Sequence, residues 1–439
     1  MMAKPRKTLV VLALAALLAG HLSLVLNRRT RHESDFDVNR RFGARLLAGE
    51  PLYDDGLCFN YMPISALYWA PLAMVPPWLG ITLRYVAAMA CLGFVLHALT
   101  RMIRHEHGQF AEKRVAVIRL TILLALHYLL RDLDDGGPNL ILLGVFVAGI
   151  DSAWKGREHL AGVWFGLGIA LKMSPALLMP FFLWKRRWRL AGTTSVAAIA
   201  WIALPSVWMG PANWWQHQSQ WNRMALTVFS GHDALRDGNE LRVQNQTLPL
   251  AIKRFLVRYP QGHPLRLSAG RDAIALNLAP ATADRIAKLT TLAVLGVCGW
   301  RSRKRYASPR NAAWLCETST VLLLMLLLSP VTWLQHMVYA IPAIFLIATQ
   351  ASTPTGLPRG AHVCLAIYVM FSLVLNRALL GRDHYLMLLG FHIHTACMLI
   401  LLVLMLWLRP TVCLRMMLPW KEDAGENRPS LSAALRRAG

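Results

Sequence analysis

The stretch HLAGVWFGLGIALKMSPALLMPFFLW occupies residues 159–184 and carries Lys172 between two apolar runs of about a dozen residues each. A helix needs about 20 residues to cross a bilayer, so neither run spans one comfortably. Ser174 and Pro175 follow the lysine and favour a break in the helix. Irregular backbone at membrane depth is tolerated only where protein or a wet cavity surrounds it. We therefore expect two short helices that meet inside a membrane protein, at a polar cavity near Lys172.

The composition of the whole chain agrees with this prediction. Its 439 residues are 55% hydrophobic and 16% charged, whereas soluble domains are about a quarter charged. The net charge of +24 would suggest nucleic acid as the partner of a soluble protein. Here the basic residues gather between apolar segments, where they orient a membrane protein, so we expect membrane lipids and no nucleic acid as partners.

Similar apolar segments recur along the chain and set its topology. Twelve are found, at about residues 8–26, 80–100, 115–130, 138–152, 159–172, 173–184, 189–208, 286–300, 312–330, 335–351, 361–380 and 388–408. Short loops rich in Lys and Arg stay in the cytoplasm, and each such loop follows an even-numbered segment. These loops lie at 101–114, 155–157, 185–189 and 301–310, and the tail from residue 409 continues the pattern. We therefore expect an all-α polytopic membrane protein with about twelve transmembrane helices and both termini in the cytoplasm.

The same pattern predicts the domain organisation. Residues 1–408 form a single integral membrane unit, and residues 409–439 form a basic cytoplasmic tail. The first external loop covers 27–79, and a long external loop covers 209–285, both with short interfacial helices. Basic residues follow the first segment in place of a cleavage site, so we interpret this segment as a retained anchor.

Two carboxylates open the first external loop. Asp35 and Asp37 precede residues 41–48, which have helical spacing and are followed by Gly49 and Pro51. A carboxylate at the start of a helix can be an ordinary N-cap. It can also take a proton from the hydroxyl of an acceptor sugar, and inverting glycosyl transfer needs one such base.

An aromatic and proline-rich stretch follows in the same loop. Residues 60–63 (Asn-Tyr-Met-Pro) lead into an apolar run that ends at 75–77, and the prolines indicate a helix that dips into the membrane interface. The aromatic belt of the headgroup layer accounts for Tyr61, Trp69 and Trp78 without any function. The alternative is that these aromatic rings form a platform on which a sugar stacks.

Lys172 and His336 are candidates for anion binding. An ionisable residue inside an apolar run is costly and marks a functional site by default. Lys172 could snorkel, but the junction of two short helices offers it no evident route to the cytoplasm, so an anion ligand is favoured. His336 opens the tenth segment at the external surface. It can be a satisfied polar cap, or it can hydrogen-bond a phosphate or carry a proton at neutral pH.

Metal binding is not expected. Asp132, Asp134 and Asp135 stand in a short external turn, and a solvated turn explains most of that composition. Three carboxylates could instead bind a divalent cation, but the stretch lacks further ligands. The seven cysteines show no CxxC pair and no Cys/His spacing for a metal. We therefore expect no metal, no other cofactor and no disulfide.

The long external loop carries a second group of candidates. Its features are Trp214, Trp215 and Trp221, then Asn245-Gln246-Thr247 and Arg254. It contains no catalytic triad, glycine-rich phosphate loop or dinucleotide fingerprint. Tryptophans at a membrane interface explain the first group. The functional alternative is a lipid-linked ligand held above the membrane.

Taken together, these stretches resemble the family 87 glycosyltransferases, membrane enzymes of the glycosyltransferase C superfamily. The similarity runs from about residue 30 to 350 and rests on the order and spacing of its pieces. These are Asp35 before residues 46–49 (Leu-Leu-Ala-Gly), Leu52-Tyr53, Tyr61-Met62-Pro63, Asn139-Leu140-Ile141-Leu142, residues 161–175 with Lys172, Asn245-Gln246-Thr247 with Arg254, and residues 329–336 with Trp333 and His336.

The resemblance implies an activity. The known activity of this family includes polyprenyl-phosphate-mannose-dependent mannosyl transfer in actinobacterial phosphatidylinositol mannoside synthesis. We therefore expect transfer of a hexose, in the first place mannose, from a polyprenyl-phosphate-linked donor to a lipid or glycan acceptor, with inversion. The reaction would occur at the external face of a bacterial cytoplasmic membrane. A transporter or flippase of a sugar-linked lipid is one alternative, because it would also need twelve helices and a cationic cavity. A structural subunit of an envelope-assembly complex is the other.

The resemblance also implies roles for single residues. Asp35 corresponds to the catalytic base, with Asp37 as the near competitor. The donor phosphate would be bound by Lys172, His336 and Arg254, which stabilise charge on the leaving group. The substrate-binding candidates are Tyr61, Asn245, Gln246 and Trp333.

The chain departs from the family pattern at three places. Asn39 stands where the family often has tyrosine, and residues 137–139 (Gly-Pro-Asn) replace the usual Gly-Gln-x-Asn. Residues 333–336 (Trp-Leu-Gln-His) contain one of the two adjacent histidines commonly seen. These departures leave the reaction class unchanged and the identity of the sugar and the acceptor open.

Overall fold

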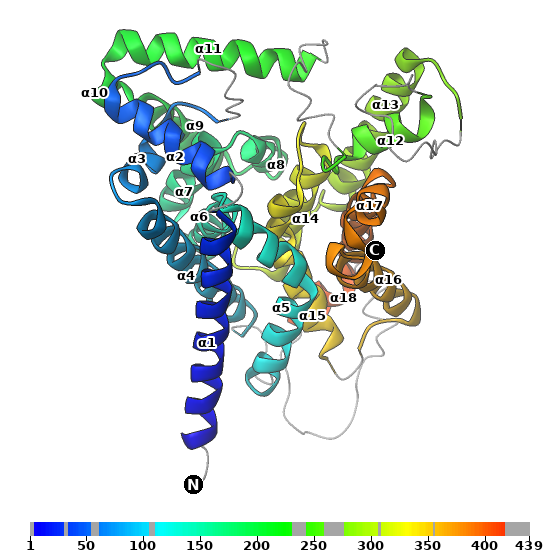
Figure 1. Ribbon diagram of the computed structural model, residues 1–439. Coiled ribbons are helices and arrows are strands. Elements are labelled where there is room, and N and C mark those ends of the chain that lie inside the picture. Colours follow the sequence, from blue (N-terminus) through cyan, green and yellow to red (C-terminus); the bar gives the residue numbers. More distant parts are fainter. Residues whose placement is uncertain are drawn as a thin grey trace, which may run out of the picture.

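The computed structural model describes residues 4–29, 34–53, 61–104, 110–230, 243–258, 276–305, 309–353 and 356–417, and these ranges contain helices and turns without a β-strand (Figure 1). The helices are α1 (Lys4–Arg29), α2 (Asp35–Ala48), α3 (Ile64–Ala73), α4 (Pro77–Arg104), α5 (Phe110–Asp135), α6 (Asn139–Trp154), α7 (Glu158–Leu171), α8 (Leu178–Trp184), α9 (Trp188–Ala203), α10 (Ser206–Met209), α11 (Pro211–Ser230), α12 (Leu248–Leu256), α13 (Pro280–Arg301), α14 (Ala312–Leu328), α15 (Ile341–Ala351), α16 (Arg359–Val369), α17 (Arg377–Gly390) and α18 (Ile393–Met417). Three short turns of other helix types complete them: η1 (Ser174–Leu177), η2 (Leu334–Ala340) and η3 (Met370–Val374). The expected all-α class is confirmed. The tail predicted from residue 409 lies outside the described residues beyond Met417.

The break predicted at Lys172 is present. Helix α7 ends at Leu171, and Lys172 has extended backbone angles, with φ −153° and ψ 121°. The 3₁₀ turn η1 follows, with Pro175 among its first residues, and leads into the seven-residue helix α8. Proline lacks an N–H and fixes φ, so it fits the first turn of a new helix and cannot continue the old one. Two short helices therefore flank an irregular segment that contains the lysine.

Several helices are long and apolar enough to cross a membrane. In the described ranges these are Pro77–Ile103, Trp188–Met209 and Leu334–Ala351. The pair Arg359–Val374 and Arg377–Gly390 is a fourth candidate, although its two parts are bent by 98°. Shorter apolar helices, among them α6 and α7, accompany them. These segments give the chain the character of an integral membrane protein.

The bend shows that the segment predicted at 361–380 is not one straight helix. Residues 370–374 form a π-helical turn, and α17 then begins in a new direction. Asn376 caps α17, because its side-chain oxygen accepts hydrogen bonds from the N–H groups of Ala378 and Leu379 at 2.8 and 3.2 Å. Asparagine at this position starts a new helix, so the helix axis changes direction inside the predicted apolar segment.

One group of helix ends lies next to the short basic loops. Arg101 at the end of α4 pairs with Asp151 near the end of α6, and Lys185 after α8 pairs with Glu317 of α14 at 2.8 Å. The large exposed side chains Trp184, Trp188 and Trp300 lie in the same helix-terminal regions. We call this group the basic end of the molecule.

The opposite helix ends meet around the predicted site. Ser65 of α3 donates a hydrogen bond to the carbonyl of Leu171 at 3.1 Å, and Arg28 at the end of α1 pairs with Asp134 at 2.7 Å. Exposed tryptophans recur here as well, at Trp78, Trp208 and Trp215. Tryptophan is enriched at both membrane interfaces, so two such groups are typical of a spanning protein. We call this group the site end; that it faces the external side stays a prediction.

Close helix contacts position the site end. Gly43 of α2 lies against the backbone of Trp69 in α3, where an added Cβ would come within 2.5 Å of the Trp69 carbonyl carbon. The Trp69 ring also packs edge-on against Phe36 at 5.7 Å between ring centroids. Trp69 is only 1% exposed, so the predicted interfacial belt does not account for it, whereas Trp78 is 60% exposed and agrees with that interpretation. Helix α2 is thereby fixed on α3.

Candidate functional site

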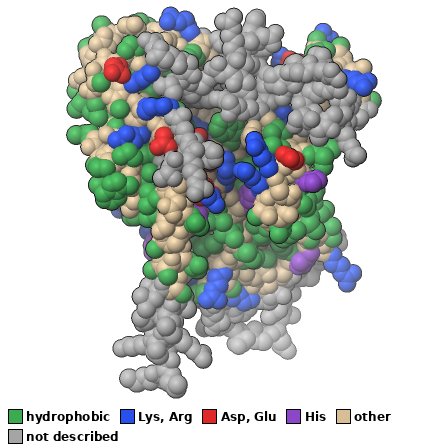
Figure 2. Space-filling view, viewed as in Figure 1, with side chains coloured by type: hydrophobic (Ala, Val, Ile, Leu, Met, Phe, Trp, Pro, Cys, Tyr) green, Lys and Arg blue, Asp and Glu red, His purple; other side chains and the backbone are tan. Residues whose placement is uncertain are grey.

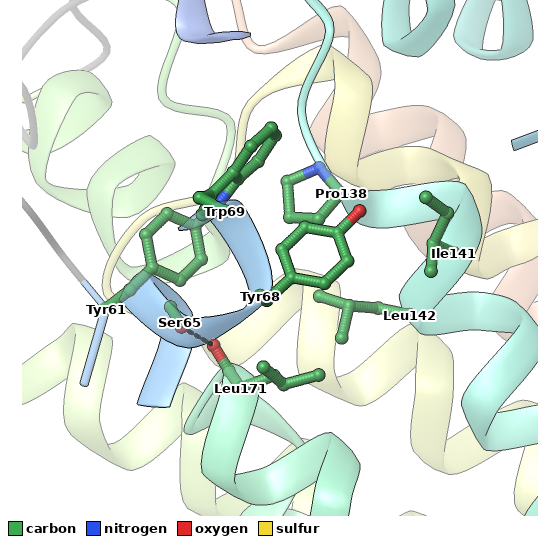
Figure 3. Close-up of a pocket in the computed structure, with 8 residues that line it drawn as sticks. All are labelled: Tyr61, Ser65, Tyr68, Trp69, Pro138, Ile141, Leu142 and Leu171. Atoms are coloured by element: carbon green, nitrogen blue, oxygen red, sulfur yellow. Dashed lines mark hydrogen bonds between the residues drawn. The ribbon is translucent and has the colours of Figure 1, made fainter. Parts of the chain in front are cut away.

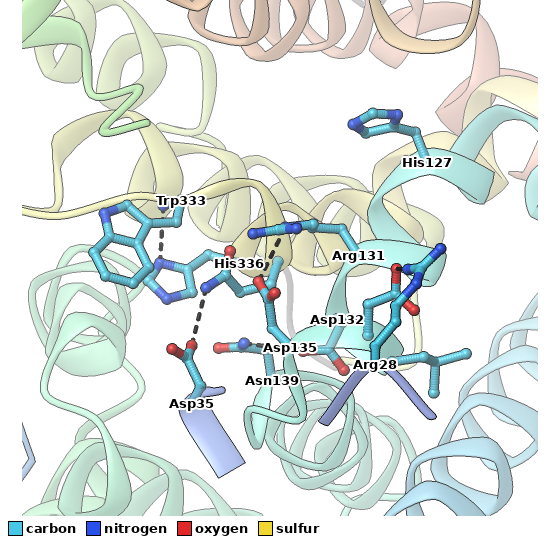
Figure 4. A network of polar contacts seen from close by, with 12 residues as sticks. Arg28, Asp35, His127, Arg131, Asp132, Asp135, Asn139, Trp333 and His336 are labelled. Carbon is cyan, nitrogen blue, oxygen red and sulfur yellow. Dashed lines mark hydrogen bonds and ion pairs between the residues drawn. The ribbon is translucent and has the colours of Figure 1, made fainter. Parts of the chain in front are cut away.

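The two carboxylates at the start of α2 have different environments. Asp37 accepts hydrogen bonds from the N–H and the hydroxyl of Ser34 at 3.0 and 2.7 Å, which forms a capping box. Asp35 is the first residue of the helix, and its carboxylate accepts a hydrogen bond from the side-chain amide of Gln335 at 3.1 Å (Figure 4). The cap thus holds Asp37, while Asp35 faces the turn η2 across the site end.

Asp35 is a carboxylate held in a partly desolvated place. Burial raises the pKa of Asp35 above its ordinary value, and the hydrogen bond from Gln335 and the charges of Arg131 and Lys172 oppose that shift. A carboxylate with a raised pKa accepts a proton more readily than an ordinary one. This environment is therefore suited to a general base.

Lys172 begins a series of buried, hydrogen-bonded polar side chains that come from several helices. Its ammonium donates to the side-chain oxygen of Asn139 at 3.0 Å, and the amide nitrogen of Asn139 donates to Asp132 at 2.9 Å. The other carboxylate oxygen of Asp132 pairs with Arg84 at 2.9 Å. This series of contacts thus connects the lysine after α7 to α6, α5 and α4.

Aromatic rings flank the same ammonium. The nitrogen of Lys172 lies 6.0 Å from the ring centroid of Tyr61 and 5.7 Å from that of Tyr339. At this distance the electron-rich ring faces attract a cation. The ring of Tyr61 also lines a small, mostly apolar cleft (Figure 3). Its lining residues are Tyr61, Ser65, Tyr68, Trp69, Pro138, Ile141, Leu142 and Leu171.

His336 and Gln335 lie on η2, and Trp333 directly precedes this turn. The two rings are stacked, with centroids 6.3 Å apart and an interplanar angle of 7°. The backbone N–H of Trp333 donates to Nδ1 of His336 at 3.2 Å. A nitrogen that accepts this bond cannot carry the proton, so the neutral ring has its N–H at Nε2. His336 can therefore donate a hydrogen bond from Nε2.

Asn245 and Gln246 organise the backbone that precedes η2. Asn245 donates to the carbonyl of Pro330 and accepts from the N–H of Thr332, both at 3.0 Å. Gln246 donates its side-chain amide to the carbonyl of Leu389 at 2.8 Å. Both side chains are at most 1% exposed. The structure thus places these two predicted substrate ligands among main-chain groups that hold the site.

Arg254 lies on α12 and faces the turn between α17 and α18. Its guanidinium contacts Nε2 of His392 at 3.0 Å, and its side chain is 4% exposed. Helix α12 packs on α13 and α14. Arg254 therefore belongs to a different polar cluster from Lys172, whose cluster contains Asn139, Asp132 and Arg84.

Several residues of the site were not predicted. Arg131 of α5 pairs with Asp135 at 3.0 Å, is 44% exposed, and its positive charge acts on Asp35. In Figure 4 its side chain extends from α5 toward Trp333 and His336. Figure 2 shows Lys and Arg side chains gathered in the centre of the face that Figure 1 presents. Arg131 thus adds a cation near the carboxylate.

The solvated turn predicted for the acidic cluster is wrong for Asp132. This residue lies within α5, is 0% exposed and pairs with Arg84, which is 3% exposed. One sequence signal could have found this pair: Arg84 is the only charged residue in the apolar segment 80–100, as Lys172 is in its own. In the described part of the chain, no group of three or more His, Cys, Asp or Glu side chains is arranged to hold a metal ion.

Comparison with known proteins gives one family and several relatives. The model of glycosyltransferase family 87 matches residues 59–330. A polyprenol-phosphate-mannose-dependent α-(1-2)-phosphatidylinositol mannoside mannosyltransferase of Mycolicibacterium smegmatis is 26% identical over 354 residues, which cover 74% of this chain and 71% of the relative. A protein of the same description from Mycobacterium tuberculosis is 23% identical over 391 residues, or 83% of this chain and 80% of the relative.

A further relative is a mannosyltransferase of a related kind. It is a polyprenol-phosphate-mannose-dependent α-(1-2)-phosphatidylinositol pentamannoside mannosyltransferase of Mycobacterium tuberculosis, 28% identical over 291 residues. That match covers 66% of this chain and 58% of the relative. No solved structure matches the chain.

Proposed function

Because this chain belongs to glycosyltransferase family 87 and is a glycosyltransferase of the membrane, we propose that it transfers mannose from a polyprenyl-phosphate-linked donor to a lipid or glycan acceptor. The homologous enzymes named above depend on polyprenol-phosphate-mannose. The observation that carries the proposal is the geometry of Asp35, which faces Gln335 while Asp37 caps the helix. A base for the acceptor hydroxyl and a cation for the leaving phosphate are what this transfer requires.

The proposed architecture is that of the glycosyltransferase C superfamily. All twelve predicted apolar segments coincide with helical structure, and α2, α3 and α12 are the short helices of the proposed external loops, to which the longer α11 is added. In this arrangement the site end faces the outside of a bacterial cytoplasmic membrane. The lipid tail of the donor then lies between helices and brings its phosphate to the plane of Lys172.

The proposed mechanism is a single displacement. Asp35 takes the proton of the acceptor hydroxyl as the oxygen attacks the anomeric carbon. The bond from that carbon to the phosphate oxygen breaks, and the leaving group departs as a polyprenyl phosphate. Lys172 and His336 stabilise the charge that it gains. Arg131 takes the place of Arg254 in this proposal, because the charge of Arg131 acts on Asp35 whereas Arg254 contacts His392. One displacement inverts the anomeric configuration.

The direct test uses purified protein and polyprenyl-phosphate-mannose. We expect mannose to be transferred to a mannosylated phospholipid acceptor, with an α-linked product from a β-linked donor by NMR. A product that retains the donor configuration would contradict the single displacement. Movement of intact donor across vesicles without transfer would favour a transporter instead.

A further inference from the structure

Asn139 separates the cation of the site from the nearest buried carboxylate. Lys172 donates to the side-chain oxygen of Asn139 at 3.0 Å, and the amide nitrogen of Asn139 donates to Asp132 at 2.9 Å. Asn139 is 1% exposed and Asp132 is 0% exposed. One amide thus binds an ammonium with its oxygen and a carboxylate with its nitrogen, and keeps the two charges apart.

The charge of Asp132 is balanced on its other side. Arg84 pairs with the second carboxylate oxygen at 2.9 Å and is itself 3% exposed. Arg84 also donates from Nε to the carbonyl of Gly137 at 3.0 Å, next to the turn that starts α6. A buried charge needs a hydrogen-bonded partner, and Arg84 supplies it. Asp132 therefore does not require Lys172 as its counter-ion.

The two aromatic rings that lie closest to the ammonium of Lys172 carry no charge. They are the ring faces of Tyr61 and Tyr339 at 6.0 and 5.7 Å. Within the described residues, no carboxylate lies within 4.0 Å of the ammonium. An ammonium has three N–H donors, and Asn139 accepts one of them. Lys172 is thus held in place by a neutral amide and not by a paired carboxylate.

We propose that Asn139 is a positioning residue that holds Lys172 for the donor phosphate without neutralising it. This inference rests on the proposed function, and the ligand class is the phosphate of a polyprenyl lipid. A carboxylate at residue 139 would hold the lysine equally well but would compete with the phosphate for its charge. An apolar side chain would leave both Lys172 and Asp132 without their shared partner. An amide of this length avoids both effects.

The test compares charge variants of similar shape. Asn139→Asp replaces the amide by a carboxylate, and Asn222→Asp makes the same change on the exposed face of α11. Binding of a polyprenyl monophosphate to the purified full chain is measured by ligand-induced thermal stabilisation in detergent. Steady-state turnover with polyprenyl-phosphate-mannose then separates KM from kcat. Lys172→Met is the reference for loss of the cation.

We expect Asn139→Asp to weaken lipid phosphate binding about tenfold or more and to raise the KM of the donor by a similar factor. Its kcat should fall as well, because Lys172 also stabilises the charge that the departing phosphate gains, while the melting temperature without ligand should stay close to that of the wild type. Asn222→Asp should bind as the wild type does. A purely structural role would lower the melting temperature without ligand and would not weaken lipid phosphate binding or raise the KM of the donor selectively.

A second variant keeps the test decisive if Asn139→Asp does not fold. Asn139→Asp combined with Asp132→Asn exchanges the amide and the carboxylate and keeps the net charge; it should show the same loss of donor binding. If either folded variant binds the lipid phosphate normally while Lys172→Met does not, the role of Asn139 is wrong and the proposed function stands. If Lys172→Met also binds normally, the donor site itself is misplaced.

Discussion

At the scale of single residues, the proposed chemistry depends on the balance of groups around Asp35. Burial raises the pKa of this carboxyl group, and the hydrogen bond from Gln335 acts in the opposite direction. Loss of a proton is needed before Asp35 can act as a base. The rate constant kcat/KM should therefore fall as the pH drops through the pKa of Asp35.

This balance gives a prediction for Gln335. Gln335→Leu removes a hydrogen bond that stabilises the charged carboxylate, so the pKa of Asp35 should rise further. The acidic limb of the profile of kcat/KM against pH should then move to higher pH. Gln218→Leu, a change of the same kind in α11, is the control and should leave the limb in place. An unmoved limb in Gln335→Leu would separate Gln335 from the titrating group.

The sequence indicated which residues matter more readily than how they differ. It brought Asp35 and Asp37 into the same first turn, but only the contacts of Ser34 show that Asp37 is part of the cap. The capping pattern was present in the sequence, with Ser34 three residues before Asp37. The partner of Asp35 could not be found in this way, because Gln335 is 300 residues away along the chain.

At the scale of elements, the position of α2 decides where Asp35 lies. Gly43 allows α2 to approach the backbone of Trp69 closely, and Phe36 of the first turn packs on the ring of the same tryptophan. A side chain at residue 43 would force the two helices apart. The base would then move relative to Gln335, and misplacement by about 1 Å can cost about a hundredfold in rate.

We therefore predict that Gly43→Ala lowers both stability and turnover. Overpacking of this kind typically costs about 1–3 kcal/mol, because the added Cβ would lie 2.5 Å from backbone atoms of Trp69. Gly93→Ala in α4 is the matched control, since an added Cβ meets no atom within 4 Å there. Melting temperature in detergent and transfer rate are the two measurements. Equal behaviour of the two variants would mean that the contact of α2 with α3 does not position the base.

Apolar runs predicted the helices well and their directions less well. The break at Lys172 could be predicted because a charge, a serine and a proline follow one another there. The 98° bend between α16 and α17 was missed, because the apolar residues on both sides of Asn376 and Arg377 were read as one segment. Only Asn376, as a possible N-cap, indicated it.

At the scale of the whole molecule, the helix ends fall into the two groups described above. At the basic end, contacts such as the ion pair of Lys185 with Glu317 hold the helix ends together. At the site end, the series of polar contacts from Lys172 to Arg84 does so. The periodic recurrence of basic loops predicted this grouping. The meeting of α2 with η2 depends on how all the intervening helices pack, so no local pattern contained it.

This grouping predicts opposite accessibility for two positions. In a chain without its seven native cysteines, Glu50→Cys should react with a membrane-impermeant thiol reagent in intact cells. Arg303→Cys at the basic end should react only after lysis, because short basic loops remain in the cytoplasm. Both side chains are exposed, so access to the reagent is set by the membrane. The reverse pattern would show that the molecule has the opposite orientation in the membrane. Labelling of both sites in intact cells would contradict the predicted topology.

The measurement that tests the central claim most directly is the transfer rate of Asp35→Asn beside that of Asp37→Asn, with the same polyprenyl-phosphate-mannose donor. Asp35→Asn should lose about a hundredfold to ten-thousandfold in kcat while it still binds the donor, because a general base is removed. Asp37→Asn should keep most of its turnover and lose stability, because its carboxylate serves the cap. An active Asp35→Asn beside an inactive Asp37→Asn would move the base to Asp37, and full activity of both would contradict base catalysis from α2.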